Sequence, residues 1–306
     1  MDFKNVSVIP VGAEGSEDVL VDDRGRVYTG LADGRIIRVS EHGAQIDSIA
    51  QLPGRPLGIE FYGDDELVVC ASDAGLLAVA ISTGAVRTLA DTVSGAPMIA
   101  CNNAAVAADG TIYFSDSSQR YPIPQWRKDL VQQTRTGRLL RRDPDGSVQE
   151  LLSGLHFANG VALAEDESFV TVAESGGCRV QRVWLTGPRA GTRDVFLDGL
   201  AGYPDNTSTG SDGLIWVAVA SPKVAALGIT QRMPRPVRSL VTRLPESLQP
   251  SPKRTVGVLG VSAEGHVVHS FQGEIEGFRM LTGVRERDGK LYFGTLVGSA
   301  IATADR

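Results

Sequence analysis

A turn rich in acidic residues and glycine, followed by a short β-rich run, occurs six times along the chain and limits the possible folds more than any other feature. Each copy starts with Asp and has Gly or a second acidic residue within two positions, and the aromatic and β-branched residues that follow favour a strand. The copies begin at Asp23, Asp64, Asp109, Asp166, Asp212 and Asp288. Their spacing of about 40 to 76 residues is typical of a β-propeller with six blades.

The composition agrees with an all-β, six-bladed β-propeller that forms one domain over residues 1–306. The 35 glycines exceed the roughly 21 expected for this length, and the repeat places many of them in turns. Hydrophobic residues make up 42% of the chain, enough for a core. A β-sandwich would also contain many short strands, but it would not explain the sixfold recurrence. We expect a strand near Val6–Val11 to close the last blade.

Two stretches, 119–136 and 220–255, interrupt the repeat and are interpreted as insertions on one rim, where a propeller usually has its binding surface. They contain several arginines, which we interpret as solvated loop charges rather than as a site for an anionic substrate. These arginines include Arg127, Arg135, Arg232, Arg235 and Arg238.

Several classes of function find no support in the sequence. The net charge of −6 argues against a nucleic-acid partner. No apolar run is long enough for a membrane helix and no signal peptide is evident, so we expect a cytoplasmic protein without a membrane partner. The three cysteines indicate no disulfide framework, and the four histidines are too scattered for a zinc site. Serine-hydrolase, phosphate-loop and dinucleotide motifs are also missing.

A set of oxygen-bearing side chains remains, each next to glycine or proline and each ahead of a different repeat. They are Glu17, Asn102 with Asn103, Asn159, and Asp205 with Asn206. Taken singly, such residues most often form turns. A propeller would bring them together at its central channel, where carboxylates and carboxamides suit Ca²⁺. We therefore expect one central Ca²⁺, although other divalent metals are possible.

These residues lie in motifs through which the chain resembles the calcium-dependent six-bladed propellers: strictosidine synthase-like proteins, gluconolactonases and paraoxonases. The resemblance runs from about Gly12 to Gly298 and is strongest to the strictosidine synthase-like branch. The stretches that carry it are 54–59, 109–118, 136–140, 157–163, 172–175, 202–206 and 288–295.

The resemblance implies roles for individual residues. Glu17, Asn102, Asn159 and Asp205 would be ligands of the central metal, with Asn206 as a fifth candidate. Asp205 is our candidate for the general base, and Asn102 and Asn206 would orient the substrate. Three further residues are expected to bind substrate: Asn103, Arg55 and Trp126.

Departures from the family pattern narrow the expected activity. Asn103 stands where the pattern of a second, structural calcium site has Asp, which argues against that site here. Leu57 replaces the histidine of the paraoxonase dyad, and Thr282 replaces the catalytic glutamate of strictosidine synthase, while Glu286 aligns with a different residue of that motif. The sequence therefore argues against strictosidine-type condensation.

The sequence thus predicts a calcium-dependent lactonase or esterase that acts on a small molecule, with the metal polarising the carbonyl. Two alternatives stay open. One is hydrolysis of aryl esters or organophosphates at the same site, and the other is a non-catalytic propeller that calcium stabilises and that binds a partner on one rim. The oligomeric state is open as well.

Overall fold

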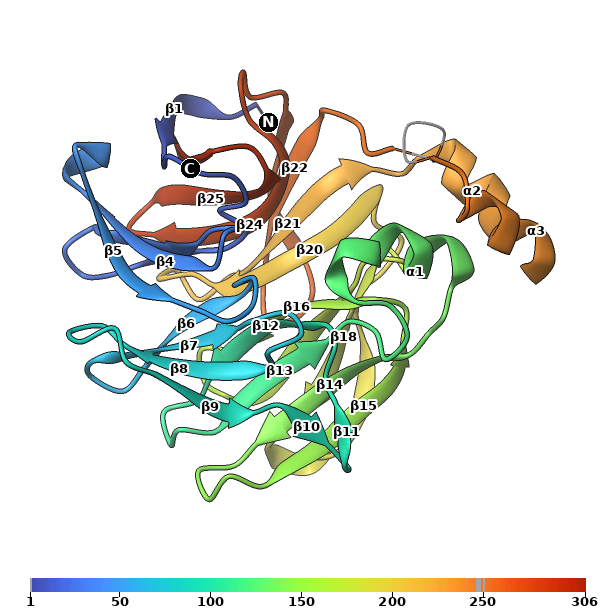
Figure 1. Cartoon of the computed structure of the whole chain (residues 1–306), viewed down its shortest axis with the longest axis horizontal. Coiled ribbons are helices and arrows are strands. Elements are labelled where there is room, and N and C mark those ends of the chain that lie inside the picture. The colour runs from blue at the N-terminus through green and yellow to red at the C-terminus, as the bar shows by residue number, and fades with distance from the viewer. Residues whose placement is uncertain (1, 246–248, 250) are drawn as a thin grey trace.

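Six four-stranded antiparallel sheets are arranged around a central channel in the computed structural model (Figure 1). The structure describes residues 2–245, 249 and 251–306, so residue 1 of the predicted domain and residues 246–248 and 250 of the predicted second insertion lie outside it. The innermost strands of adjacent blades contact one another around a complete ring. The predicted six-bladed propeller is confirmed.

Each blade is a meander whose strands follow one another from the channel to the rim. Blade one consists of β2 (Val19–Val21), β3 (Val27–Gly30), β4 (Arg35–Ser40) and β5 (Gln45–Gln51). Blade two consists of β6 (Ile59–Tyr62), β7 (Glu66–Cys70), β8 (Leu76–Ala80) and β9 (Val86–Ala90). Blade three consists of β12 (Cys101–Val106), β13 (Ile112–Asp116), β14 (Gly137–Arg142) and β15 (Val148–Leu155). Blade four consists of β16 (Ala158–Leu163), β17 (Phe169–Glu174), β18 (Arg179–Trp184) and β19 (Arg193–Leu197). Blade five consists of β20 (Gly202–Thr209), β21 (Ile215–Pro222), β22 (Val256–Val261) and β23 (Val267–Gly273). Blade six consists of β24 (Arg279–Arg287), β25 (Lys290–Val297), β26 (Ala300–Asp305) and β1 (Lys4–Pro10).

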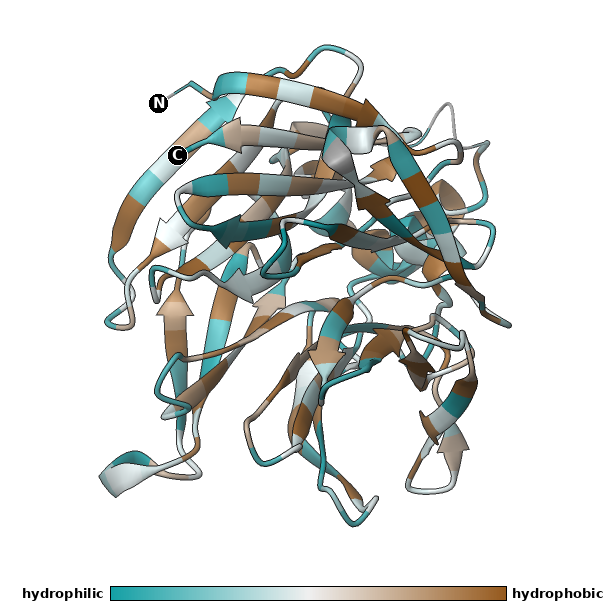
Figure 2. Cartoon of the chain, turned by 90° about the vertical axis from the view of Figure 1, so that its left-hand side faces the viewer, coloured by the Kyte–Doolittle hydropathy of each residue, from teal (hydrophilic) through white to brown (hydrophobic). Residues whose placement is uncertain are grey.

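Burial decreases from the channel to the rim, and the sequence of each strand reflects its place. Every residue of the innermost strand β16 is buried, whereas the outermost strands β5 and β9 are mostly exposed. Hydrophilic and hydrophobic residues alternate along outer strands because successive side chains point to opposite faces (Figure 2).

The core is divided among the six interfaces between adjacent blades. One apolar cluster fills each interface; for example, Trp216 of blade five packs with Phe293 of blade six, and Tyr28 of blade one packs with Leu67 of blade two. A further cluster, which includes Leu57, Leu130 and Leu227, lies beneath the insertions. Each blade is therefore stabilised by both of its neighbours.

The N-terminal strand closes the ring. β1 pairs antiparallel with β26 from Lys4 opposite Asp305 to Pro10 opposite Ala300, so blade six combines the two ends of the chain. The strand that was expected near Val6–Val11 does close the last blade.

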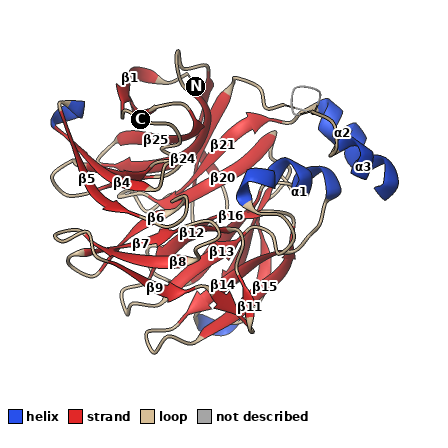
Figure 3. Cartoon of the chain, in the orientation of Figure 1, coloured by secondary structure: helices blue, strands red, loops and turns tan. Residues whose placement is uncertain are grey.

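The insertions supply the helices on one side of the ring (Figure 3). The 3-10 helix η2 (Ile123–Gln125) and α1 (Trp126–Gln132) connect the second and third strands of blade three, and α2 (Ala225–Gln231) and α3 (Arg235–Val241) do the same in blade five. The remaining short elements are the hairpin of β10 (Thr92–Val93) and β11 (Ala96–Pro97) and the 3-10 helices η1 (Glu41–Gly43) and η3 (Gly187–Arg189).

Removal of the first eleven residues is expected to lower the free energy of unfolding by roughly 3 kcal/mol or more, because the backbone hydrogen bonds of β1 are lost and the edge of β26 is exposed. Urea denaturation measures this change. The double variant Val6→Thr/Val8→Thr keeps the backbone pairing and should stay within about 0.5 kcal/mol of the wild type. A truncated chain that unfolds at the wild-type urea concentration would contradict closure by β1.

Candidate active site in the central channel

The predicted metal ligands lie on or just before the innermost strands of four blades. Glu17 precedes β2, Asn102 and Asn159 are the second residues of β12 and β16, and Asp205 and Asn206 lie in β20. Because the blades repeat around one axis, these equivalent positions converge at the channel.

Four of these side chains, those of Glu17, Asn102, Asn159 and Asp205, line one cavity of about 710 Å³, a volume that includes the part open to solvent. The other lining residues are mostly apolar and come from both insertions and from the blades. They are Ile123, Trp126, Leu130, Phe157, Ser175, Tyr203, Ala220, Ser221, Val224, Leu227, Ser251, Pro252, Met280 and Leu296. Such a cavity, apolar with a few convergent polar groups, is typical of a small-molecule site.

All five predicted ligands have a buried side-chain oxygen that accepts no hydrogen bond from any described residue. These atoms are Glu17 Oε2, Asn102 Oδ1, Asn159 Oδ1, Asp205 Oδ1 and Asn206 Oδ1. Buried polar atoms nearly always have a partner, so five such oxygens around one channel fit a cation. Carboxylate and carboxamide oxygens are the donors that Ca²⁺ takes. Only two members of this set are carboxylates. Among the described residues there is no group of three or more His, Cys, Asp or Glu side chains that could hold a metal.

Serines orient two of the carboxamides in the same way. The Nδ2 atom of Asn102 donates to Ser117 Oγ (2.9 Å), and that of Asn159 donates to Ser175 Oγ (3.2 Å). Ser175 in turn donates to the carbonyl of Pro204 (2.6 Å), directly before Asp205. Because each amide nitrogen is engaged, the Oδ1 atom is the end of the side chain left to bind a cation.

The carboxylates of the site resist ionisation. Burial raises the pKa of Glu17 to about 7, although the Arg55 guanidinium, with Nη2 3.6 Å from Glu17 Oε2, opposes the shift, and Asp18 adds to it. Burial and the nearby Glu17 raise the pKa of Asp205 well above its ordinary value. A divalent cation between these carboxylates would favour the charged form of both.

Close approach of neighbouring inner strands positions the ligands and requires glycine. A Cβ atom on Gly160 of β16 would lie 2.2 Å from Thr207 N and 2.5 Å from the Asp205 carbonyl oxygen. A Cβ atom on Gly58, just before β6, would similarly lie 2.5 Å from Asn103 Cα. These glycines let the ligand-bearing strands β20 and β12 pack directly against the preceding blades.

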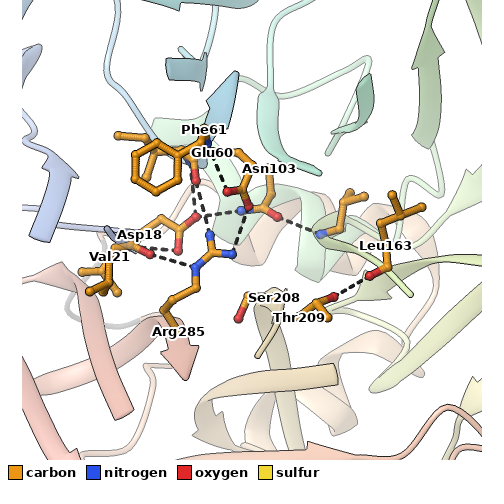
Figure 4. A network of polar contacts seen from close by, with 12 residues as sticks. Asp18, Val21, Glu60, Phe61, Asn103, Leu163, Ser208, Thr209 and Arg285 are labelled. Carbon is orange, nitrogen blue, oxygen red and sulfur yellow. Dashed lines mark hydrogen bonds and ion pairs between the residues drawn. The ribbon is translucent and has the colours of Figure 1, made fainter. Parts of the chain in front are cut away.

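A second polar network contains a partly buried arginine (Figure 4). Arg285 of β24 contacts Glu60 (Nη1 to Oε2, 3.0 Å) and donates to the carbonyls of Val19 and Ile59. Burial raises the pKa of Asp18 to about 6, and Arg285 is the main influence that opposes this shift. A guanidinium therefore compensates the carboxylates at this position.

Asn103 belongs to that network and is not among the residues that line the cavity. Its Nδ2 donates to Asp18 Oδ2 (3.1 Å), and its Oδ1 accepts from Val161 N (2.8 Å). Both ends of the amide are engaged in a buried setting, so this geometry gives no support to the predicted role of Asn103 in substrate binding, which stays a prediction. An Asp at this position would place two carboxylates against each other.

The other predicted residues lie at different distances from the cavity. Trp126 lines it, whereas Arg55 lies beside it, donating to the carbonyl of the lining residue Leu296 (3.2 Å). Leu57 is fully buried in the cluster beneath the insertions. The hydroxyl of Thr282 donates to the Glu17 carbonyl (2.8 Å) and so fixes the backbone of that predicted ligand.

Sequence reasoning missed most of the cavity wall. Phe157, Tyr203 and Ser175 lie within stretches that carry the family resemblance, but nothing in the sequence shows which side chains face the channel. The sequence does contain one signal: Asn102 and Asn159 are the second residues of inner strands, and Ser117 and Ser175 each follow the next strand of the same blade.

Two family models match the chain. The model described as strictosidine synthase matches residues 102–188, and the model described as strictosidine synthase-like, N-terminal, matches residues 2–39. The chain is 33% identical to the protein STRICTOSIDINE SYNTHASE-LIKE 10 of Arabidopsis thaliana, over 96% of this chain and 86% of that protein. It is 32% identical to the adipocyte plasma membrane-associated protein of Salmo salar, over 88% of this chain and 70% of that protein.

Solved structures of low sequence identity share the fold. A gluconolactonase from Xanthomonas campestris superposes with a TM-score of 0.71 at 16% identity, covering 98% of this chain and 89% of its own. Regucalcin from Agrobacterium tumefaciens, described as a calcium-binding protein, gives a TM-score of 0.67 at 14% identity, covering 100% of this chain and 96% of its own.

The substitution Gly160→Ala is expected to lower the free energy of unfolding by about 1–3 kcal/mol, because the added methyl group collides with the β20 backbone. Chemical denaturation measures the loss. Gly228→Ala in α2 is the matched control: its Cβ would meet no atom within 4 Å, and alanine favours a helix, so this variant should be as stable as the wild type or slightly more stable. Equal stability of Gly160→Ala and wild type would contradict the close approach of β16 and β20.

Proposed function

The chain belongs to the strictosidine synthase-like family, and on that premise we propose that it is a divalent-cation-dependent hydrolase of a lactone or related ester. The observation that carries the proposal is the set of five buried oxygens that accept no hydrogen bond, four of them on side chains that line a cavity of small-molecule size. The hydrogen bond of Thr282 to the Glu17 carbonyl and the pairing of the buried Glu286 with Arg306 support the expectation that the chain does not catalyse a condensation of the strictosidine type.

Glu17, Asn102, Asn159, Asp205 and Asn206 would hold the cation, with Ca²⁺ as the ion that best suits their oxygens. When bound, the cation would supply Lewis-acid polarisation of the substrate carbonyl. The regucalcin and gluconolactonase likenesses support this choice of ion and reaction.

Asp205 is the proposed general base. Glu17, Asn102, Asn159 and Asn206 are all at most 4% exposed, whereas Asp205 is only half-buried and lines the cavity, so water can reach it. In the cation-free protein, burial and Glu17 raise the pKa of Asp205, and a bound cation would lower it again and keep the carboxylate in the ionised form that a base needs. With Oδ1, the oxygen that lacks a hydrogen bond, on the cation, the other carboxylate oxygen of Asp205 would accept the proton of the attacking water.

The cavity wall favours a substrate with an apolar group. Trp126, Phe157, Leu227 and Met280 contribute apolar surface. The hydroxyl of Tyr203, a polar group of the wall, accepts the hydrogen bond of Val224 N (3.0 Å). A polyhydroxylated sugar lactone would leave hydroxyl groups against these apolar side chains at a cost in free energy, so an alkyl or aryl lactone or ester fits better.

A panel of lactones, aryl esters and organophosphates, assayed with and without chelator, tests the function. We expect hydrolysis of an alkyl lactone, its loss on chelation, its return on addition of Ca²⁺, and slower turnover of gluconolactone. Asp205→Ala should lower kcat by about 10²–10⁴-fold, in keeping with loss of a general base. Asp198→Ala, at an exposed carboxylate outside the cavity wall, is the matched control variant.

Full activity of an Asp205→Ala variant that still binds calcium would eliminate Asp205 as the base. Turnover confined to aryl esters or organophosphates would support the alternative hydrolase. A chelator effect on melting temperature without turnover of any compound would support the non-catalytic, calcium-stabilised propeller.

Cation affinity is expected to depend on pH through Glu17. Below its raised pKa of about 7, Glu17 holds a proton in the cation-free protein, and a cation must displace that proton. Affinity should therefore fall as the pH is lowered from about 8 to about 6, by up to about tenfold per pH unit for each proton released. Calorimetric titration with Ca²⁺ at several pH values measures this, and an affinity that is constant over the range would exclude Glu17 as a ligand.

A further inference from the structure

The outward face of the α2–α3 insertion is unusually apolar for a protein surface. Two of its side chains, Leu240 (64% exposed) and Ile229 (58% exposed), are more exposed than any other large apolar side chain of the described residues. Three more exposed apolar side chains lie on the same segment: Met233, Val237 and Leu244. We refer to these five residues as the α2–α3 patch.

The opposite face of the same helices is held against α1, so the patch is fixed in its outward orientation. Gln231 Nε2 donates to the Leu130 carbonyl (2.9 Å), and Arg238 Nη1 donates to the Gln132 carbonyl (2.7 Å). Leu227 is buried on this inner side and lines the cavity. The apolar patch is therefore on the face that the fold does not use for its own packing.

The segment that carries the patch has an excess of basic residues. Residues 223–245 contain five basic residues and no Asp or Glu, although the whole chain has a net charge of −6. Four of the five basic side chains are exposed, those of Lys223, Arg232, Arg235 and Arg243. A basic segment with protruding apolar side chains is typical of a protein surface that binds anionic lipids.

We propose that the α2–α3 patch docks on the surface of an anionic lipid bilayer. Its apolar side chains would enter the boundary between headgroups and acyl chains, and the surrounding arginines would contact lipid phosphates. No helix among the described residues is long and apolar enough to cross a membrane. This proposal departs from the sequence-based expectation of no membrane partner, which considered spanning segments and signal peptides alone.

The position of the patch links the bilayer to the cavity. Val224 and Leu227 line the cavity from the same insertion whose outer face carries Ile229 and Met233. Docking would bring this wall of the cavity close to the lipid surface, where apolar esters and lactones concentrate. The docking itself does not depend on the proposed hydrolase activity.

Flotation of the full chain with phosphatidylcholine vesicles, with and without phosphatidylglycerol, tests the proposal. We expect binding only to the vesicles that contain phosphatidylglycerol, and its reversal at high salt. Ile229→Glu/Leu240→Glu should weaken binding by about tenfold or more, since both insertion and charge are lost. Arg232→Gln, Arg235→Gln and Arg243→Gln should each weaken it by about fivefold.

Val267→Glu/Val268→Glu on β23 is the matched control, because these exposed apolar side chains (47% and 51%) lie outside the patch. It should bind vesicles like the wild type, and circular dichroism should show that every variant is folded. Equal vesicle binding by the patch and control variants would overturn the proposal. So would a lack of vesicle binding by the wild type together with a dimer in light scattering that Ile229→Glu/Leu240→Glu dissociates, because the occupant would then be a second copy of the chain.

Discussion

The pairing of β1 with β26 is the interaction on which the rest of the structure depends. Each apolar cluster of the core lies between two blades, so no blade buries its faces without its neighbours. A ring that lacked its closing strand would leave β26 as an open edge and loosen blade six against blades five and one. Since Glu17 follows β1 after a few residues, the same closure places the first predicted ligand at the channel.

Two groups of carboxylates lie at the channel, and their charges are compensated in different ways. Arg285 provides a positive charge from within the chain to Asp18 and Glu60, and Asn103 donates a further hydrogen bond to Asp18. Near the cavity, Arg55 lies 3.6 Å from Glu17 and opposes its raised pKa only in part, while Asp205 and three carboxamide oxygens lack partners. The polar groups of the first site have partners within the chain, whereas the second leaves oxygens without hydrogen bonds, in keeping with the proposed cation.

The two insertions add helices, cavity wall and exposed apolar surface to the propeller. They supply all three α-helices of the described residues, they form much of the apolar cavity wall, and one of them presents the α2–α3 patch. The gluconolactonase and regucalcin structures share the propeller ring with this chain, although their sequence identities to it are low. The fold is therefore shared, and differences in substrate and partner are expected to reside in these segments.

The sixfold turn-and-strand repeat determined the fold class, because local turn chemistry and strand propensity recur in every blade. The same pattern located Glu17, Asn102, Asn159 and Asp205 ahead of separate repeats, and these residues do line one cavity. The sequence could not separate Asn102 from Asn103: adjacent residues of a strand point to opposite faces, and only the tertiary structure turns one toward the cavity and the other toward Asp18 and Val161. Nor could it reveal the apolar wall or the α2–α3 patch, because which side of a short helix is covered depends on contacts with α1, a segment about 100 residues distant in the chain.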